Sequence, residues 1–516
     1  LGAESGRVVA GMFDGRKLEL REVHRFVNAP VQIGMGFYWN ILGLFSEIKN
    51  GIRTAVQECN GPITSLGVDA WGVDYALVDI RGALVENPRS YRDPRTKGMQ
   101  AEAFLRVPRR DIYEATGIQF MEINTLYQLM SEIVAESPTV AAADRLLFIP
   151  DLINYWLTGR KSCERTIAST GQIIDPRTGD WAYDMLEKLG IPTTILGEIV
   201  EPGSVLGHLQ QSIRDDTGAG AITVVAPGCH DTASAVAAIP AEIDRYAYIS
   251  SGTWSLMGIE SPEPVINDGS YAYDFTNEGG VCDTIRVLKN ISGMWMVQEC
   301  RRTWAGQGDE LNYAQMTRLA GQSSPFVALL DPDDPDFLAP GDMPARIVAY
   351  CHRTGQTPPE DKGSILRTAL ESLALRYRDV MVKLEDILGY ELDVIHIVGG
   401  GTQNTLLNQM AADAVGKPVV SGPVEATSAG NILMQMLASG DIASLQEGRQ
   451  VIANSFSTET YEPQLHDAWD QAFERFKEIA EKKKEVNDQD LDALVADERR
   501  SVADAYQLEH VQVTCG

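Results

Sequence analysis

The sequence lacks a long hydrophobic run and a basic cluster. No apolar stretch approaches the ~20 residues needed to span a bilayer, so we expect no membrane partner. Acidic residues outnumber basic ones, 72 to 44, and the formal net charge is −28. This charge argues against binding to nucleic acid or to an anionic membrane surface, because no basic patch compensates for it. The triplet Lys482–Lys484 is flanked by Glu481 and Glu485 and is interpreted as a solvated helix face.

Paired cysteines are also missing. The seven cysteines are scattered, and none forms a C-x-x-C pair. This pattern is typical of reduced thiols, so we expect a cytoplasmic protein without a zinc site.

The length predicts more than one domain. A chain of 516 residues is too long for a single hydrophobic core, and 44% hydrophobic with 22% charged residues is typical of a globular protein. We expect an N-terminal domain over residues 1–240, a C-terminal domain over 241–475 and a charged tail, helical or disordered, over 476–516. Both blocks open with a strand, a small-residue turn and a second strand, which indicates a duplicated α/β unit.

One stretch carries the strongest chemical signal. Pro227–Val236 follows the apolar β-branched run Ile222–Ala226 and leads into small residues. The pattern predicts a buried strand, a turn and a closely packed helix. Asp231 then lies at the start of the helix beside His230, where a carboxylate is able to accept a proton from a substrate hydroxyl. The alternative is that Asp231 only caps the helix.

The start of the chain predicts a β-hairpin. Asp14 and Gly15 separate two strand-like runs, and the small-residue turn Leu1–Arg7 precedes them. Such a turn either brings backbone amides close to a phosphate or is only a turn. A helix over residues 42–59 is expected next.

The strand predicted over residues 63–69 runs into a polar kink. There Trp71, Gly72 and Asp74 either line a ligand cleft or serve as core and cap residues. The following loop, Tyr91–Thr96, suits either a hydroxyl-rich ligand or a self-paired surface loop.

The second block offers two turns suited to phosphate. Ser250–Thr253 is a hydroxyl-rich turn between strands, although it is equally well read as an ordinary hairpin turn. Val394–Val398 predicts a strand, Gly399–Asn404 a Gly-rich turn, and a helix begins near Thr405. A helix N-terminus favours phosphate, but this turn matches neither the dinucleotide fingerprint nor the P-loop. His396, inside the apolar strand, is interpreted as a core histidine.

With these motifs in hand, the chain resembles the FGGY family of carbohydrate kinases, within the actin-like ATPase superfamily. The resemblance runs from Leu1 to about Pro463 and rests on five motifs: Gly67–Asp74, Tyr91–Asp93, His230–Val236, Ser250–Gly258 and Val398–Asn404. It implies an α/β fold with two actin-like (ribonuclease H-like) domains around a central nucleotide and sugar cleft.

The resemblance also implies a reaction. It implies transfer of the γ-phosphoryl group of ATP, with Mg²⁺, to O1 of a ketose. The Trp71–Asp74 stretch is similar to family members that act on L-rhamnulose, which implies L-rhamnulose 1-phosphate and ADP as products in L-rhamnose degradation. No metal ligand is assigned, and a monomer or weak homodimer is expected.

Site residues follow from the same resemblance, position by position. The implied catalytic base is Asp231. The implied sugar contacts are Gly72, His230, Asp231, Thr232 and Asn290, and the implied nucleotide contacts are Ala3, Glu4, Ser5, Gly6, Arg7, Thr253, Gln298 and Gly400.

One departure and three alternatives remain. In the family a strand ending in Asp precedes the first phosphate turn, and Leu1 corresponds to the residue after that Asp. Either the sequence is truncated before Leu1 or the protein has lost this strand; a missing strand would leave an open sheet edge, and a missing acid would weaken Mg²⁺ binding. The alternatives are a kinase for another ketose (fuculose or a pentulose), an actin-like regulatory ATPase, and an inactive nucleotide-binding homologue. His230, Asp231 and the Trp71-Gly72 pair count against a regulatory ATPase, which needs neither a base nor a sugar pocket.

Overall fold

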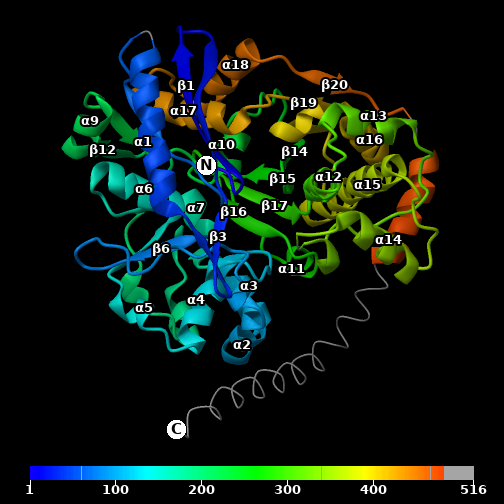
Figure 1. Cartoon of the computed structure of the whole chain (residues 1–516), viewed down its shortest axis with the longest axis horizontal. Helices are drawn as coiled ribbons and strands as arrows, with labels where there is room; N and C mark the ends of the chain where they lie inside the picture. Colours follow the sequence, from blue (N-terminus) through cyan, green and yellow to red (C-terminus); the bar gives the residue numbers. More distant parts are fainter. Residues whose placement is uncertain (60, 339, 465–466, 481–516) are drawn as a thin grey trace, which may run out of the picture.

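The structure, a computed structural model, describes residues 1–59, 61–338, 340–464 and 467–480. Figure 1 shows two halves side by side, here called the first half (residues 1–240) and the second half (residues 241–480). Of the expected tail, residues 481–516 lie outside the described residues. Residues 467–480 are helical, and Trp469, Phe473 and Phe476 are buried in the core of the second half.

The first half combines short strands with helices. Its strands are β1 (Ser5–Phe13), β2 (Leu18–Val27), β3 (Pro30–Ile33), β4 (Gly36–Trp39), β5 (Ser65–Gly67), β6 (Tyr75–Val78), β7 (Arg145–Phe148), β8 (Cys163–Glu164), β9 (Ile174–Asp175), β10 (Asp180–Trp181), β11 (Ile199–Val200), β12 (Val205–His208) and β13 (Thr223–Val225). Its helices are α1 (Ile41–Glu58), α2 (Met99–Arg106), α3 (Arg109–Thr116), α4 (Thr125–Val134), α5 (Pro138–Ala142), α6 (Ile149–Thr158), α7 (Arg165–Ser169), α8 (Tyr183–Leu189), α9 (Gln211–Thr217) and α10 (Asp231–Ala237). The hairpin, the helix predicted over 42–59 and the strand, turn and helix around Asp231 are confirmed.

The sheets of the first half are not continuous. Strands β1 and β2 form an antiparallel hairpin whose turn is closed by Asp14 Oδ1, which accepts hydrogen bonds from the backbone N–H groups of Arg16 and Lys17. Strand β5 pairs in parallel with β13, which also pairs with β12. Among the described residues β1 pairs with β2 alone and β5 with β13 alone, and a cavity of about 780 Å³ separates their free edges.

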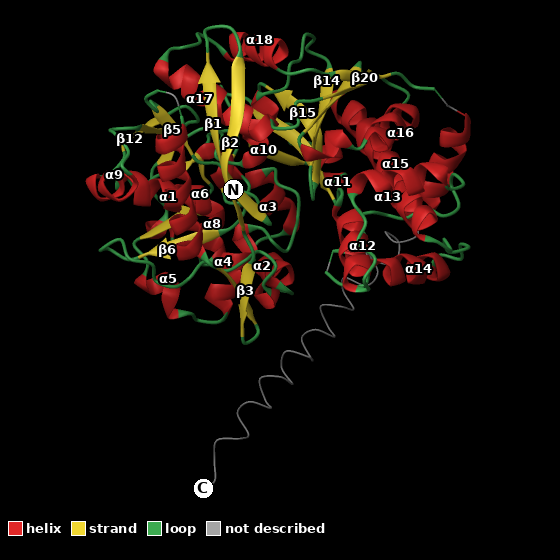
Figure 2. Ribbon diagram, turned by 45° about the horizontal axis from the view of Figure 1, so that its top comes forward, coloured by secondary structure: helices red, strands yellow, loops and turns green. Residues whose placement is uncertain are grey.

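The second half is built on one seven-stranded sheet with strand order β16-β17-β15-β14-β18-β19-β20. Figure 2 shows part of this sheet, with β14, β15 and β20 labelled. Its strands are β14 (Tyr246–Ser251), β15 (Ser255–Ser261), β16 (Thr276–Gly279), β17 (Ile285–Ile291), β18 (Val394–Val398), β19 (Val419–Ser421) and β20 (Glu459–Tyr461). Its helices are α11 (Asp268–Ala272), α12 (Trp295–Gly306), α13 (Tyr313–Gln322), α14 (Met343–Arg353), α15 (Lys362–Leu388), α16 (Thr405–Val415), α17 (Ala426–Ser439) and α18 (Leu445–Ser455). The duplication predicted from the sequence therefore extends to the opening hairpins, whereas only the second hairpin lies within a continuous sheet.

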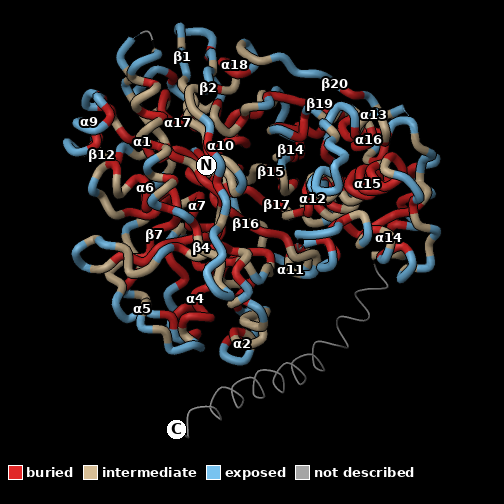
Figure 3. The backbone as a smooth tube through the Cα atoms, in the orientation of Figure 1, coloured by how far each residue is buried: buried red, intermediate tan, exposed pale blue. Residues whose placement is uncertain are grey.

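The start and the end of the long helix α15 are determined by local sequence signals. Asp361 caps it in a capping box with Ser364, and Gly389, with φ of 73°, ends it. Between these signals apolar residues recur at helical spacing, and most of them are buried (Figure 3), with α13 and α16 as the main neighbours of the helix. The sequence prediction of a long buried helix is confirmed.

A small hydrophobic cluster joins the two halves. It contains side chains of α10, β14, β15, β17, β18 and α17, among them Ala235, Val236, Tyr248, Leu256, Leu288, Val398 and Leu433. Helices α10 and α17 cross very closely, since a Cβ added to Gly430 would lie 1.7 Å from the carbonyl oxygen of Ser234. The small residues of α10, which predicted close packing, are thus required by this crossing. Within the described residues, no helix is both long and apolar enough to cross a membrane.

We expect Gly430→Ala to destabilise the protein. The added methyl group would overlap the backbone of α10, and overpacking of this kind typically reduces the free energy of unfolding by about 1–3 kcal/mol. Thermal unfolding measures the effect. Gly306→Ala is the matched control, because a Cβ at Gly306, the last residue of α12, meets nothing within 4 Å. Equal melting temperatures for the two variants would contradict the close crossing.

Candidate active site

Asp231 is the first residue of α10 and does not act as its cap. The residue at the N-cap position is His230, which makes no capping hydrogen bond with its side chain. The backbone of this turn is fixed to the segment after β5, because Asp231 N donates to Ala70 O at 3.0 Å and Ala70 N donates to Cys229 O at 2.8 Å. The Asp231 side chain is 34% exposed and lines the cavity between β1 and β5. Of the two readings of Asp231, the cap is not supported.

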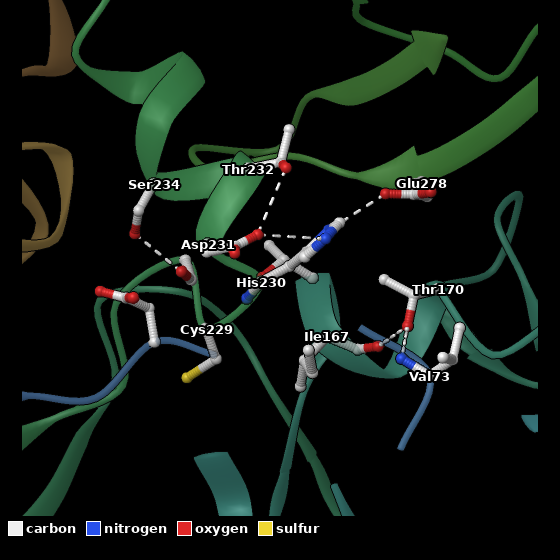
Figure 4. Close-up of polar contacts among 12 residues, drawn as sticks. Val73, Ile167, Thr170, Cys229, His230, Asp231, Thr232, Ser234 and Glu278 are labelled. Atoms are coloured by element: carbon white, nitrogen blue, oxygen red, sulfur yellow. Dashed lines mark hydrogen bonds and ion pairs between the residues drawn. The ribbon is translucent and has the colours of Figure 1, made fainter. Parts of the chain in front are cut away.

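The surroundings of Asp231 raise the pKa of its carboxyl group. Burial is the largest cause, His230 opposes the shift, and the nearby Asp69 adds to it. His230 Nε2 lies 3.5 Å from Asp231 Oδ1, and Thr232 Oγ1 donates to the same oxygen at 3.3 Å (Figure 4). A carboxylate with a raised pKa, open to a cavity, is a better proton acceptor than an ordinary surface Asp.

A buried carboxylate beneath the turn holds its backbone. Glu164 is fully buried and accepts hydrogen bonds from Cys229 N at 3.0 Å and from Thr166 Oγ1 at 2.6 Å. Thr166 Oγ1 in turn accepts from His230 N at 3.1 Å. Burial raises the pKa of Glu164 to about 6, even though four hydrogen bonds stabilise the ionised form. Sequence reasoning missed Glu164, which lies 65 residues before Cys229.

Gly72 lies on a tight turn beside α7. A Cβ added to Gly72 would come within 3.1 Å of the Thr170 side chain. The next residue, Val73, has φ of 66°, an unusual conformation for a β-branched residue. Its N–H donates to Thr170 Oγ1 at 3.0 Å and its carbonyl accepts from Thr125 Oγ1 at 2.6 Å, and these bonds hold the turn in place.

The role of Asp74, left open by the sequence, is structural. Its side chain is fully buried and accepts from Trp39 Nε1 at 2.6 Å and Trp71 Nε1 at 2.9 Å. The backbone N–H of Tyr91 and the amide of Gln128 complete its contacts at 3.1 Å each. Burial raises its pKa to about 6 against these hydrogen bonds. Asp74 and Trp71 therefore form the framework behind Gly72.

Asn290 comes from the second half, on β17. Its backbone N–H and its Nδ2 both donate to Oε1 of Gln119, at 3.0 and 3.3 Å. Gln119 belongs to the first half, so Asn290 lies at a contact between the two halves.

The two turns of the second half that suit phosphate pack against each other. Strand β18 ends at Val398, a short 3₁₀ helix covers Gly400–Gln403, and α16 begins at Thr405 with Asn404 as its cap. A Cβ added to Gly401 would lie 1.9 Å from Ser251 Oγ, whereas a Cβ on Gly400 meets nothing within 4 Å. Gly401 is therefore needed for packing, and Gly400 faces open space.

Helix α12 begins beside the same turns. Trp295 N donates to Thr253 O and Met294 N donates to Gly252 O, both at 3.1 Å. One turn further along, Gln298 Oε1 is buried without a hydrogen-bond partner in the described part of the chain. An amide oxygen left in this way is available to a ligand's hydrogen-bond donor.

The turn at residues 1–7 lies at the cavity between β1 and β5. Ser5 and Arg7 line this cavity together with Asp69 and Asp231, and Arg7 forms an ion pair of 2.6 Å with Glu425. The other predicted site residues do not line it: Ala3, Glu4, Gly6, Gly72, His230, Thr232, Thr253, Asn290, Gln298 and Gly400. Glu4 pairs instead with Arg302 of α12 at 3.3 Å.

The donors available to a metal ion are few. No cluster of three or more His, Cys, Asp or Glu side chains suited to a metal occurs within the described ranges. Asp69 and Asp231 are two of the three aspartates that line the cavity, the third being Asp441, and Asn431 Nδ2 donates to Asp69 Oδ2 at 2.6 Å. Two carboxylates suit Mg²⁺, which commonly takes one or two from the protein and its other oxygens from water and phosphate.

Comparison with known proteins gives consistent matches along the chain. The model of the N-terminal domain of the FGGY family of carbohydrate kinases matches residues 10–238, and that of the C-terminal domain matches residues 247–439. The rhamnulokinase of Bacteroides thetaiotaomicron is 43% identical over 477 residues, which are 92% of this chain and 97% of that protein. The rhamnulokinase of Oceanobacillus iheyensis is 40% identical over 89% of this chain and 97% of its own length.

Solved structures of the same fold are more distant in sequence. A ligand-bound xylulose kinase from Lactobacillus acidophilus superposes with a TM-score of 0.75 at 15% identity, covering 95% of this chain and 97% of its own. The glycerol kinase of Plasmodium falciparum with ADP gives 0.70 at 15% identity, covering 94% and 98%. These matches confirm the expected two-domain α/β fold. Together with the domain models and the relatives, they show that the chain belongs to the FGGY family of carbohydrate kinases.

Proposed function

We propose that this chain transfers the γ-phosphoryl group of ATP to O1 of L-rhamnulose, with Asp231 as the general base. The observation that carries the proposal is the state of Asp231: it lies one residue past the N-cap position of α10, its pKa is raised by burial, and it opens into a cavity. The rhamnulokinase relatives support the choice of sugar.

We assign the sugar contacts to Gly72, His230, Thr232 and Asn290, beside the base. His230 and Thr232 flank the Asp231 carboxylate, and Gly72 lies on the turn fixed by Thr170. Asn290 brings an amide from the second half. Hydroxyl groups of a ketose would hydrogen-bond to such side chains, which orient O1 toward the base and so contribute to the rate by positioning.

We assign the nucleotide contacts to the second half, at Gly400, Thr253 and Gln298, and to the turn formed by Ala3, Glu4, Ser5, Gly6 and Arg7. The open side of Gly400 and the unpartnered Gln298 Oε1 fit a nucleotide. When bound, ATP supplies the phosphoryl group and Mg²⁺ neutralises phosphate charge. In this proposal the residues of the protein position both substrates, and Asp231 Oδ1 is the proton acceptor.

We expect L-rhamnulose to be the preferred acceptor. In a coupled ADP-release assay with L-rhamnulose, L-fuculose, xylulose and glycerol, its kcat/KM should exceed those of xylulose and glycerol by at least about tenfold, since one methyl group in a fitted pocket is worth about 10–200-fold. Phosphorus NMR of the product should show the phosphate on O1. A higher kcat/KM for glycerol or xylulose would overturn the choice of sugar, and no turnover with any acceptor would favour an inactive nucleotide-binding homologue.

We expect Gly400→Val to weaken ATP binding while the fold is kept. A Cβ at Gly400 meets no protein atom within 4 Å, so the valine side chain is expected to extend into the space assigned to phosphate. Calorimetry should show the Kd for ATP rising by at least about tenfold, or about 1.4 kcal/mol, with ketose binding unchanged. Gly220→Val is the control, because that position is equally open and does not belong to the proposed site. An unchanged Kd for ATP in folded Gly400→Val would remove Gly400 from the site.

A further inference from the structure

An ion pair that the sequence analysis did not single out lies behind His230. Glu278 on β16 and Arg286 on β17 are directly opposite each other in the sheet register. Both are buried, and Arg286 is completely inaccessible. Arg286 Nη2 donates to Glu278 Oε2 at 2.9 Å, and Arg286 Nε donates to Gly279 O at 2.9 Å. These bonds fix the carboxylate and the guanidinium in one orientation.

Both charged groups reach the far side of the His230 ring. His230 Nδ1 lies 3.1 Å from Glu278 Oε2 and 3.1 Å from Arg286 Nη2. The other ring nitrogen, Nε2, faces Asp231 Oδ1 at 3.5 Å. Figure 4 shows the imidazole between the two carboxylates, with one nitrogen turned to each. The ring is therefore held from the side that the proposed sugar site does not use.

The strand that carries Glu278 is fixed to the first half. β16 is an edge strand of the large sheet, and its backbone N–H groups on the open edge donate hydrogen bonds to residues of the first half. Asn277 N donates to Gly117 O at 2.8 Å, and Gly279 N donates to Ser169 Oγ at 2.8 Å. These two bonds flank Glu278 on both sides. Glu278 therefore lies on a strand of the second half that is hydrogen-bonded to the first half, and these bonds hold it beside His230.

Charge is retained at Glu278 despite its burial. Burial alone would raise the pKa of its carboxyl group, but the Arg286 cation and the hydrogen bond to His230 outweigh it and hold the pKa below the usual value. A charged carboxylate is a stronger hydrogen-bond partner for an imidazole than a neutral acid. The charged and polar groups that face His230 are Asp231, Glu278, Arg286 and, at its backbone, Thr166.

We propose that Glu278 and Arg286 are positioning residues, which act on the sugar through His230 by fixing its ring with Nε2 toward Asp231 and the acceptor. The inference rests on the proposed function, because it takes His230 as a sugar contact and Asp231 as the base. It adds a contribution of the second half to the sugar side of the reaction, made by residues that touch neither substrate.

A double-mutant cycle tests the proposal. Glu278→Gln keeps the size of the side chain and removes its charge, so kcat/KM for the ketose should fall by about 10- to 100-fold, the loss expected when a contacting group is misplaced by about 1 Å. In a His230→Asn background the same substitution should change kcat/KM by no more than about twofold, because the residue it acts through is gone. The KM for ATP should stay unchanged in all variants, and calorimetry without ATP should show weaker ketose binding in Glu278→Gln.

Two further variants separate positioning from folding. Glu371→Gln removes the charge from another buried carboxylate, which pairs with Arg367 on α15 at 2.7 Å and does not contact His230, and its ketose kcat/KM should stay within about twofold of the parent. If Glu278→Gln does not fold because Arg286 is left unpaired, the cycle is run with Glu278→Leu and Arg286→Met together, which leaves no buried charge.

The outcomes are distinct from those that test the function itself. Two results would overturn the positioning role while the parent remains an active kinase. One is that the falls in ketose kcat/KM caused by Glu278→Gln and His230→Asn multiply in the double variant; the other is an unchanged ketose kcat/KM in folded Glu278→Gln. A parent that phosphorylates no ketose would overturn the proposed function, and with it the basis of this inference.

Discussion

Helices α10 and α17 approach so closely that no methyl group fits between Gly430 and the carbonyl of Ser234. Helix α10 begins with Asp231, and α17 belongs to the second half, so this contact ties the proposed base to the opposite domain. The next residue of α17, Asn431, also donates to Asp69 at 2.6 Å. One helix therefore fixes two of the three aspartates that line the cavity, Asp69 and Asp231. Any drift of α17 would move the base and its neighbour together.

Three acidic side chains with raised pKa values show why such a shift alone does not identify a base. Asp74 and Glu164 are fully buried, and each accepts four hydrogen bonds from surrounding donors. These bonds use up their oxygen atoms, and no route to a substrate remains. Asp231 differs because it is 34% exposed, and the hydrogen bonds to its carboxylate within the described chain come from Thr232 alone, with His230 Nε2 at 3.5 Å. Exposure and free lone pairs, and not the pKa shift, distinguish it.

Much of the fold was predictable because its signals are local. The Asp14-Gly15 turn, the strand before Asp231, the strand ending at Val398 and the helix from Thr405 all follow from a few adjacent residues. The strand expected over residues 63–69 is shorter, Ser65–Gly67, since one of its edges faces a cavity and not another strand. The open sheet edge in the first half was expected from the family resemblance and not from a local pattern, since strand pairing is long-range.

The support of the candidate site could not be predicted from the sequence for the same reason. Glu164 reaches Cys229 across 65 residues and Arg286 reaches His230 across 56, and neither lies in a recognisable motif. Asp74 was left open between a ligand and a structural role, and only its complete burial and its bonds to Trp39 and Trp71 decide the matter. The motif residues could be predicted because each belongs to a short, recognisable stretch of sequence. The residues that hold them in place could not be predicted, because they lie far away in the sequence.

The central claim is that Asp231 accepts the proton of the sugar hydroxyl, and Asp231→Asn tests it most directly. Asparagine keeps the size and hydrogen bonding of the side chain but cannot accept that proton. Steady-state kinetics with the preferred ketose and ATP should show kcat falling by about 10²–10⁴-fold while both KM values change little. A folded variant that keeps kcat within about threefold of the parent would contradict the account.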